Sequence, residues 1–412
     1  MSATHASEAT PLLSTGGQEV SRKSIVSEIG ILTKYATRLP ACGSQLLEHS
    51  IVMAPILSIG HMSTTALAGI TLGSMTMNVT GITVLQGLGG ALDTLLPPAW
   101  TSPHPELVGL WSQRMAVVMA AVLLPMYFLW WNAEVILLAL KQDPEVVYFA
   151  SLYLRWVSMG MPGYALNLIT RRYFQSQGLF AIPTQILCIV ALVNAVLNYL
   201  LVWGPRQIRL GFIGAPIATC LSLTLAAILS LAYGAFLAPR PRTAWTPLSA
   251  QSFTNLGMLI RLGAAGVGQI ASEWWAWEFA ALAASWLGPE SLASQSILLS
   301  SATTTWQAFA ALGLAAAVRV GNLLGERNPS RARVAANIAL AMVLFVSLLL
   351  SIMLLVLRNS WAYMFSSDPA VVQCVASILP IIAVFQVFDG VSSVIGGQFR
   401  AKGQQVRLHF SR

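Results

Sequence analysis

Ten apolar stretches of about twenty residues or more divide this chain, and they restrict it to the architecture of a helical membrane protein. A bilayer offers the backbone no hydrogen-bonding partners, so each stretch must satisfy its own N–H and C=O groups as a helix. Only 9% of the 412 residues are charged, whereas soluble domains carry about 25%. We therefore predict an all-α polytopic membrane protein embedded in a lipid bilayer. The spans are predicted at 41–61, 68–93, 114–133, 147–170, 181–203, 211–237, 256–286, 292–317, 333–357 and 370–397.

The basic residues gather in alternate loops between these spans. If the N-terminus is cytosolic, most of the 23 Lys and Arg residues lie on the cytosolic side, as the positive-inside rule requires. Both termini are then expected in the cytosol. The pI near 9.6 does not indicate nucleic-acid binding, because the basic residues form no continuous segment with interleaved aromatic residues.

An internal repeat indicates two lobes. The run Gly-Leu-Gly-Gly-Ala-Leu-Asp at 87–93 is answered by Gly-Leu-Ala-Ala-Ala-Val-Arg at 313–319, and Phe174 to Gly178 is answered at nearly the same offset by Phe399 to Gly403. An even number of helices in the first half makes the two repeats parallel in the membrane. We predict a disordered tail at 1–35, a six-helix N-lobe at 36–240, a linker at 241–255 and a C-lobe of about four helices at 256–412.

The second half of the repeat is shorter than the first. Two further apolar spans follow Gly178, whereas only nine residues follow Gly403. The repeat favours a C-lobe that lacks the last two helices, through truncation or divergence. A design of ten helices is the alternative.

The N-terminal tail carries one sorting motif. It is polar and has no apolar core, so no cleavable signal peptide is expected. Glu8, Leu12 and Leu13 fit the acidic dileucine pattern that sorting adaptors bind, which would direct the protein to a vacuole. A chance match in a polar tail is the alternative, and the plasma membrane stays open as a location.

An acid lies at membrane depth in the seventh span. Glu273 begins the run Glu-Trp-Trp-Ala-Trp-Glu, which ends at Glu278. A carboxylate at this depth normally faces a protein interior or a wet cavity and serves a proton or ion site. The neighbouring indoles of Trp274, Trp275 and Trp277 suit a cation, although they point in three directions and packing explains each equally well. A structural acid is the alternative for Glu273 and Glu278.

Four segments of the sequence resemble the multidrug and toxic compound extrusion transporters, in particular their eukaryotic and fungal branch. They are Ala-Leu-Asp-Thr-Leu at 91–95, the Glu-Trp-Trp run with Ala-Ser-Gln-Ser at 293–296, Arg-Val-Gly-Asn-Leu-Leu-Gly at 319–325 and Phe-Asp-Gly at 388–390. The resemblance covers about residue 40 to the C-terminus. One departure is Pro97-Pro98, where the family continues its first motif differently. Since proline stops helices, the second span is expected to end earlier, or more rigidly, there.

The resemblance implies a proton-coupled antiporter that exports organic cations and other xenobiotics by alternating access. Glu273 matches the seventh-helix acid of the family and Asp389 the tenth-helix acid, and both would carry substrate and protons. A proton and a cation then compete for one negative charge, and linkage makes each weaken the other's binding. Gln295 is a candidate polar contact in the cleft, with helix–helix hydrogen bonding as its alternative.

Two further charged pairs have candidate roles. Asp93 and Arg319 occupy equivalent places in the two repeats and carry opposite charges, so they are a possible cytosolic latch between the lobes, with local helix-end contacts as the alternative. Glu48 and His49 lie near one end of the first span, where ordinary solvation is the simpler interpretation.

Other function classes fit less well. A lipid-linked substrate flippase would need a strongly cationic cavity, whereas the membrane-embedded charges appear mainly acidic in the sequence. A non-transporting member of the same family is the alternative that a shortened C-lobe favours. An enzyme is not expected, because the sequence has no phosphate loop, metal cluster or nucleophile–base pair. We expect no cofactor and no metal, with the proton gradient as energy source.

Overall fold

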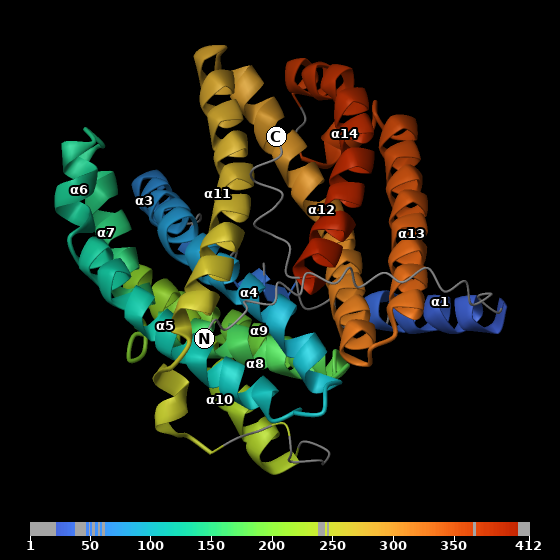
Figure 1. Ribbon diagram of the computed structural model, residues 1–412. Helices are drawn as coiled ribbons and strands as arrows, with labels where there is room; N and C mark the ends of the chain where they lie inside the picture. Colours follow the sequence, from blue (N-terminus) through green and yellow to red (C-terminus); the bar gives the residue numbers. More distant parts are fainter. Residues whose placement is uncertain are drawn as a thin grey trace, which may run out of the picture.

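The computed structural model of the chain is a bundle of long helices (Figure 1). It describes residues 22–37, 47–48, 50–51, 54–56, 58–59, 62–237, 244, 247–365 and 368–402, and these residues contain no β-strand. Helical residues occur in every one of the ten predicted spans, the first of which is described only in short pieces. Seven stretches are long and apolar enough to cross a membrane: 65–100, 107–131, 181–203, 211–236, 293–325, 329–356 and 369–401. The all-α membrane fold is therefore confirmed.

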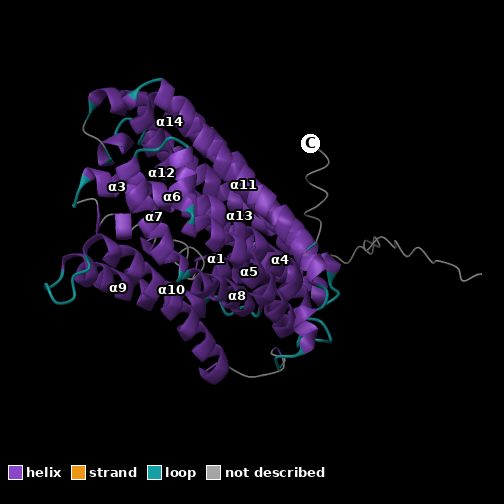
Figure 2. Ribbon diagram, turned by 90° about the vertical axis from the view of Figure 1, so that its left-hand side faces the viewer, coloured by secondary structure: helices purple, strands orange, loops and turns teal. Residues whose placement is uncertain are grey.

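The N-terminal half contains shorter and more interrupted helices than the C-terminal half. Its helices are α3 (Thr64–Met77), η1 (Asn78–Ile82), α4 (Thr83–Trp100), α5 (Leu107–Trp131), α6 (Ala133–Ala139), α7 (Pro144–Ser158), α8 (Met161–Ser176), α9 (Ala181–Trp203), η2 (Gly211–Ile213), α10 (Gly214–Ala232) and η3 (Tyr233–Leu237). After η5 (Ala250–Phe253), the second half consists of α11 (Leu256–Trp286), α12 (Pro289–Gly325), α13 (Pro329–Val356), η6 (Trp361–Met364) and α14 (Pro369–Ala401). Figure 2 shows the length of α11 and the absence of strands in the described chain.

The second span does not end at its two prolines, and the expectation of an early stop was wrong. α4 includes Pro97 and Pro98 and continues to Trp100. Proline removes only its own N–H donor and the clash is limited to the preceding turn, so a pair of prolines in the last turn interrupts few helical bonds. The prolines also pack on α12: a Cβ atom added at Gly321 would lie 2.8 Å from Pro97 Cβ.

The same span contains a turn of π-helix. Residues Asn78–Ile82 form η1, between α3 and α4, in one continuous helical segment. Trp130 of α5 stabilises it, because its indole N–H donates to Thr80 Oγ1 at 2.8 Å and its ring packs where Gly81 lacks a side chain. Single π-turns inside α-helices are frequent at functional sites.

The two halves meet mainly along α4. This helix packs on α5 and α8 in its own half and on α11 and α12 in the other. One very close approach of the two backbones is between glycines: a Cβ atom at Gly266 of α11 would lie 2.4 Å from the carbonyl oxygen of Gly87. Small residues allow such backbone contact between membrane helices.

The segment between the halves is partly ordered. Within the predicted linker, Ser252 is buried and donates to Gln113 Oε1 of α5 at 2.8 Å. Arg114 of α5 donates to the carbonyl oxygen of Gln251 at 3.1 Å. The linker therefore holds α5 close to the start of α11 instead of forming only a loose connection.

A helix occupies part of the tail that was expected to be disordered. α1 (Arg22–Thr37) lies across the ends of α12 and α13 (Figure 1). Its Glu28 is fully buried and binds Arg319 through two hydrogen bonds of 2.7 Å, and Arg331 through a third of 2.5 Å. Leu32, one turn further on, packs into the core of the C-terminal half. Glu28 and Leu32, on one face of α1, attach this helix to the C-terminal half. The polar composition of the tail did not predict this contact. The dileucine motif lies outside the described residues.

Glu28→Gln is expected to release α1. Burial raises the pKa of the Glu28 carboxyl, but the hydrogen bonds and charges of Arg319 and Arg331 outweigh it and hold the pKa below its usual value. The ion pairs therefore stabilise docking at pH values above the usual Glu pKa and are lost only in more acidic solution. Removing one partner of a buried pair costs a few kcal/mol, and these arginines are partly exposed, so we expect about 2 kcal/mol and trypsin cleavage within α1 at least about tenfold faster. Glu106→Gln, at an exposed loop, is the control. Unchanged cleavage in Glu28→Gln would contradict the docking contribution.

Candidate functional site

A cavity of about 360 Å³ lies between the two halves and is lined by both. Its first wall comes from the short described pieces of the first span and from α3, η1, α4, α8, α9 and α10. Its second wall comes from α11, α12 and α14. The volume is within the usual range of about 300–1,000 Å³ for small-molecule sites. We call this cavity the cleft.

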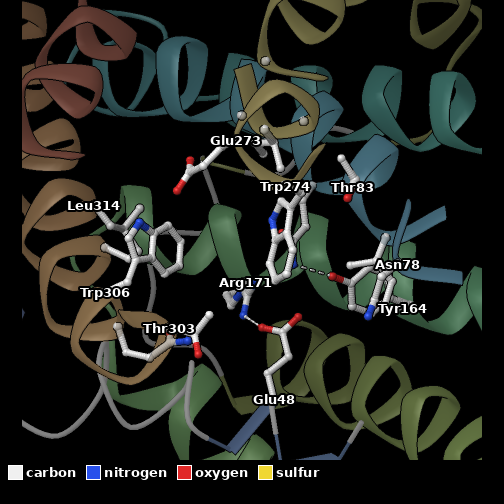
Figure 3. A pocket seen from close by; sticks show the side chains of 18 of the residues that line it. Glu48, Asn78, Thr83, Tyr164, Arg171, Glu273, Trp274, Thr303, Trp306 and Leu314 are labelled. Carbon is white, nitrogen blue, oxygen red and sulfur yellow. Dashed lines mark hydrogen bonds and ion pairs between the residues drawn. The ribbon is translucent and has the colours of Figure 1, made fainter. Parts of the chain in front are cut away.

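The second wall carries two carboxylates. Glu273 of α11 and Asp389 of α14 both line the cleft, and their charges repel each other. Three tryptophans, Trp274 and Trp277 of α11 and Trp306 of α12, line the same wall. In Figure 3 the Glu273 carboxylate points into the cavity between the labelled indoles of Trp274 and Trp306. Aromatic faces beside carboxylates attract organic cations.

Of the other residues predicted to form the cation site, some line the cleft and others do not. Trp277 lines the cleft and also packs edge-on against Phe385, with ring centroids 5.9 Å apart. Trp275 is not among the lining residues. Gln295 of α12 also lies outside the lining, and its buried Nε2 makes no hydrogen bond within the described chain. The side chain of Glu278 is outside the part of the chain that the structure describes.

Glu48 is a cleft residue and not a solvated acid near the interface. Its carboxylate accepts a hydrogen bond from Nη1 of Arg171, a buried residue of α8, and both side chains line the cleft (Figure 3). Next to them, Gln86 Nε2 donates to the hydroxyl of Tyr164 at 3.0 Å. Burial explains the pairing, because an unpaired charge at this position would lose its hydration without compensation.

The predicted latch partners each have another partner here. Asp93 Oδ1 accepts a hydrogen bond from Nη1 of Arg172, and its Oδ2 lies 3.7 Å from Nε of Arg400 on α14. Arg319 binds Glu28 of α1. The ion pair that bridges the two halves therefore joins Asp93 to Arg400, and the equivalent position in the second half is paired with the N-terminal helix.

The charge of the cleft is mixed, which corrects the mainly acidic cavity expected from the sequence. Alongside four carboxylates, three arginines line it: Arg171, Arg172 and Arg400. Among the described residues, the carboxylates without an arginine partner are Glu273 and Asp389, on the second wall. Arg172 of α8 and Arg400 of α14 both approach Asp93 of α4, and Arg171, next to Arg172 on α8, pairs with Glu48. The cleft thus has an acidic wall and a basic floor.

Several lining residues were not singled out from the sequence. Trp306 lies in the run Ser-Ser-Ala-Thr-Thr-Thr-Trp-Gln at 300–307, and this polar interruption of an apolar span was the available signal. Asn78 lines the cleft from η1, and no sequence pattern predicts a π-turn. Arg171 and Arg172 were read only as loop charges, because sequence does not show that α8 carries them inward.

No group of three or more His, Cys, Asp or Glu side chains that could hold a metal ion occurs among the described residues. Carboxylates, indoles, amides and guanidinium groups surround a partly apolar space.

Comparison with known families gives one family match. The MatE family model matches residues 40–200 and 267–408. The uncharacterized transporter C4B3.13 of Schizosaccharomyces pombe is 36% identical over 388 residues, which are 94% of this chain and 71% of that protein. Human multidrug and toxin extrusion protein 1 is 30% identical over 368 residues, 89% of this chain and 64% of that protein.

Solved structures agree with the fold. The eukaryotic MATE transporter AtDTX14 superimposes with a TM-score of 0.84 at 28% identity, over 93% of this chain and 85% of that one. The Vibrio cholerae MATE transporter VcmN superimposes with a TM-score of 0.81 at 18% identity, over 93% and 86%. The latter likeness concerns the fold alone.

Proposed function

Because the chain belongs to the MatE family of multidrug and toxin extrusion transporters, we propose that it exports organic cations in exchange for protons by alternating access. Family membership gives the chain a transport role and not an enzymatic one. The substrate class, the proton coupling and the direction of transport are the proposal.

One observation carries the proposal: Glu273 and Asp389, from two different helices, line one cavity together with the indoles of Trp274 and Trp306. Among the described residues, these two carboxylates have no arginine partner, and they place negative charge in a cavity that is also lined by apolar side chains. A lipophilic cation supplies both the compensating charge and apolar surface for the indoles.

Proton coupling follows from competition for the same charge. A proton bound to either carboxylate removes the charge that attracts the cation, and a bound cation disfavours protonation. Linkage makes these two effects equal in free energy. Proton entry from the acidic side then releases the cation on that side, and no nucleotide hydrolysis is needed.

The structural basis of alternating access is the unequal packing of the two halves. They touch along α4, where it meets the first part of α11 and the last part of α12. The sequence places these ends, together with the loops at 101–106 and 326–328, on the cytosolic side. With the orientation that the loop charges predict, the cleft is closed toward the cytosol, and separation of α4 from α11 and α12 would open it there.

The proposal is tested with purified protein in proteoliposomes. A pH gradient is imposed with the vesicle lumen more acidic than the outside. It is expected to drive uptake of a fluorescent organic cation into the lumen at least about tenfold faster than in protein-free vesicles. A sodium gradient of equal size, with the membrane potential clamped, is expected to give no acceleration. Sodium-driven uptake would contradict proton coupling, and uptake unaffected by either gradient would contradict antiport.

A further inference from the structure

The floor of the cleft holds more positive than negative charge. Glu48 balances Arg171, but Asp93 is shared by two arginines, Arg172 and Arg400. Arg172 donates directly to Asp93 Oδ1, whereas Arg400 Nε is 3.7 Å from Oδ2, which is too long for a hydrogen bond. One guanidinium charge at the floor is therefore left without an equal counter-charge among the described residues.

The same two arginines have unused donors. Nε of Arg172 and Nε of Arg400 are buried and have no hydrogen-bond acceptor in the described chain. Each guanidinium carries five N–H donors and no acceptor, and a buried donor without a partner is unfavourable. An acceptor from outside the protein would satisfy them, and an anionic oxygen would also balance the charge.

A space lined by nitrogen donors lies beside Arg400. Gly396 is one helical turn before Arg400 on α14. A Cβ atom added at Gly396 would lie 3.4 Å from Gln269 Nε2 of α11 and 3.6 Å from Arg400 Nη1. The absence of a side chain at Gly396 leaves room where an amide and a guanidinium converge from two helices.

α14 and α11 each contribute residues to both the acidic wall and the basic floor. On α14, Asp389 and Arg400 are eleven residues apart, which is about three turns and about 16 Å, and so they share one face. Ser392 and Ser393 line the cleft between them. On α11, Gln269 precedes Glu273 by one turn. Both helices thus present a donor toward the floor and a carboxylate toward the middle of the cleft.

We propose that Arg172, Arg400 and Gln269 form an anion subsite, which binds a carboxylate or phosphate group of a substrate whose cationic group lies at Glu273 and Asp389. This inference rests on the proposed function and extends its substrate class to zwitterions. Asp93 acts as a positioning residue, because it holds the Arg172 guanidinium and draws that of Arg400 toward the floor.

The test uses two dyes that differ in one group. A rhodamine methyl ester is cationic, and the same rhodamine with a free carboxylate is zwitterionic. Binding of each to the purified full chain is measured by fluorescence anisotropy, and proteoliposome uptake is measured in parallel. In Arg400→Gln, the Kd of the zwitterion is expected to rise at least about tenfold, while that of the ester stays within about twofold. Arg358→Gln, at an exposed loop arginine, is the matched control and should change neither.

A second variant distinguishes anion binding by Arg400 from its other possible role, the ion pair with Asp93 that joins the two halves. Gly396→Ala keeps every charge and places a methyl group among the donors without a clash, so it should weaken zwitterion binding several-fold and leave the ester unaffected. Equal weakening of both dyes in Arg400→Gln, with normal zwitterion binding in Gly396→Ala, would assign Arg400 to closure alone and overturn the subsite. Wild-type protein that binds and moves only the ester would also overturn it. Selective binding without uptake of either dye would support the subsite and contradict the proposed transport.

Discussion

Glu273→Gln is expected to abolish proton-driven cation transport. The substitution keeps the size of the side chain but leaves it permanently neutral, as if a proton never dissociated. Asp389 then remains as the one carboxylate of the acidic wall. Removing one partner of a buried charge pair typically costs about 2–5 kcal/mol. Because the Glu273 side chain is exposed to the cleft, the lower end of about 2 kcal/mol applies, and about 1.4 kcal/mol corresponds to a factor of ten. We therefore expect the transport rate under a pH gradient to fall at least about thirtyfold.

The pH dependence of cation binding distinguishes a coupling carboxylate from a simple contact. In the wild type, affinity should fall as the pH is lowered, because protons displace the cation from the carboxylates. In Glu273→Gln, affinity should be weak at neutral pH and should change less with pH, since only Asp389 can still titrate. Calorimetry or dye quenching at several pH values measures both quantities.

Control variants define the outcome that would contradict this role. Glu326→Gln neutralises an exposed acid in the loop between α12 and α13 and should transport like the wild type. Asp389→Asn should resemble Glu273→Gln, and the double variant should be little worse than either, because residues that act as one unit are not additive. Normal proton-driven transport by Glu273→Gln, at equal protein insertion, would show that the carboxylate is structural.

The features that the sequence predicted well depend on local information. Hydropathy predicted ten spans, and each contains helical residues in the described part of the chain, because each must satisfy its backbone alone in a bilayer. Glu273 stood out for a similar reason, since an acid in an apolar span is unusual whatever its neighbours in space are. Asp389 was reached through family resemblance, and the structure places it in the same cavity.

The features that were missed depend on which distant helices meet. Glu48 and Arg171 are 123 positions apart, and neither residue indicates its partner. The pairing of Arg319 with Glu28 spans 291 positions, so the symmetry of the repeat suggested Asp93 instead. Pro97 and Pro98 were expected to break the helix. They lie in the last turn of α4, which packs on α12, and the helix continues through them.

The contact between Gly87 and Gly266 provides the second large prediction. Gly266→Val is expected to prevent transport by separating the halves where they cross most closely. A Cβ atom at Gly266 would lie 2.4 Å from the carbonyl oxygen of Gly87, and one at Gly87 would lie 2.5 Å from the backbone nitrogen and Cα of Val267. Because both obstacles are backbone atoms, no change of rotamer relieves the clash, and α4 and α11 must move apart.

This separation has a larger effect on transport than on folding. Overpacking typically costs about 1–3 kcal/mol, which the extensive contacts of each half can absorb with a modest fall in the thermal midpoint. The closed end of the cleft is held by the same crossing and by the nearby Asp93–Arg400 pair, so the halves can no longer close there. We expect transport to fall at least about tenfold, with Gly266→Ala intermediate between the wild type and Gly266→Val.

Gly257→Ala on the same helix is the matched control. Nothing lies within 4 Å of a Cβ atom at this position, and alanine favours a helix over glycine by about 1 kcal/mol. The control should therefore transport normally and unfold at the same or a slightly higher temperature. If Gly266→Val transports at the control rate, then close approach of α4 and α11 is not needed for the transport cycle. If both variants lose transport, glycine in α11 serves helix flexibility instead of helix contact.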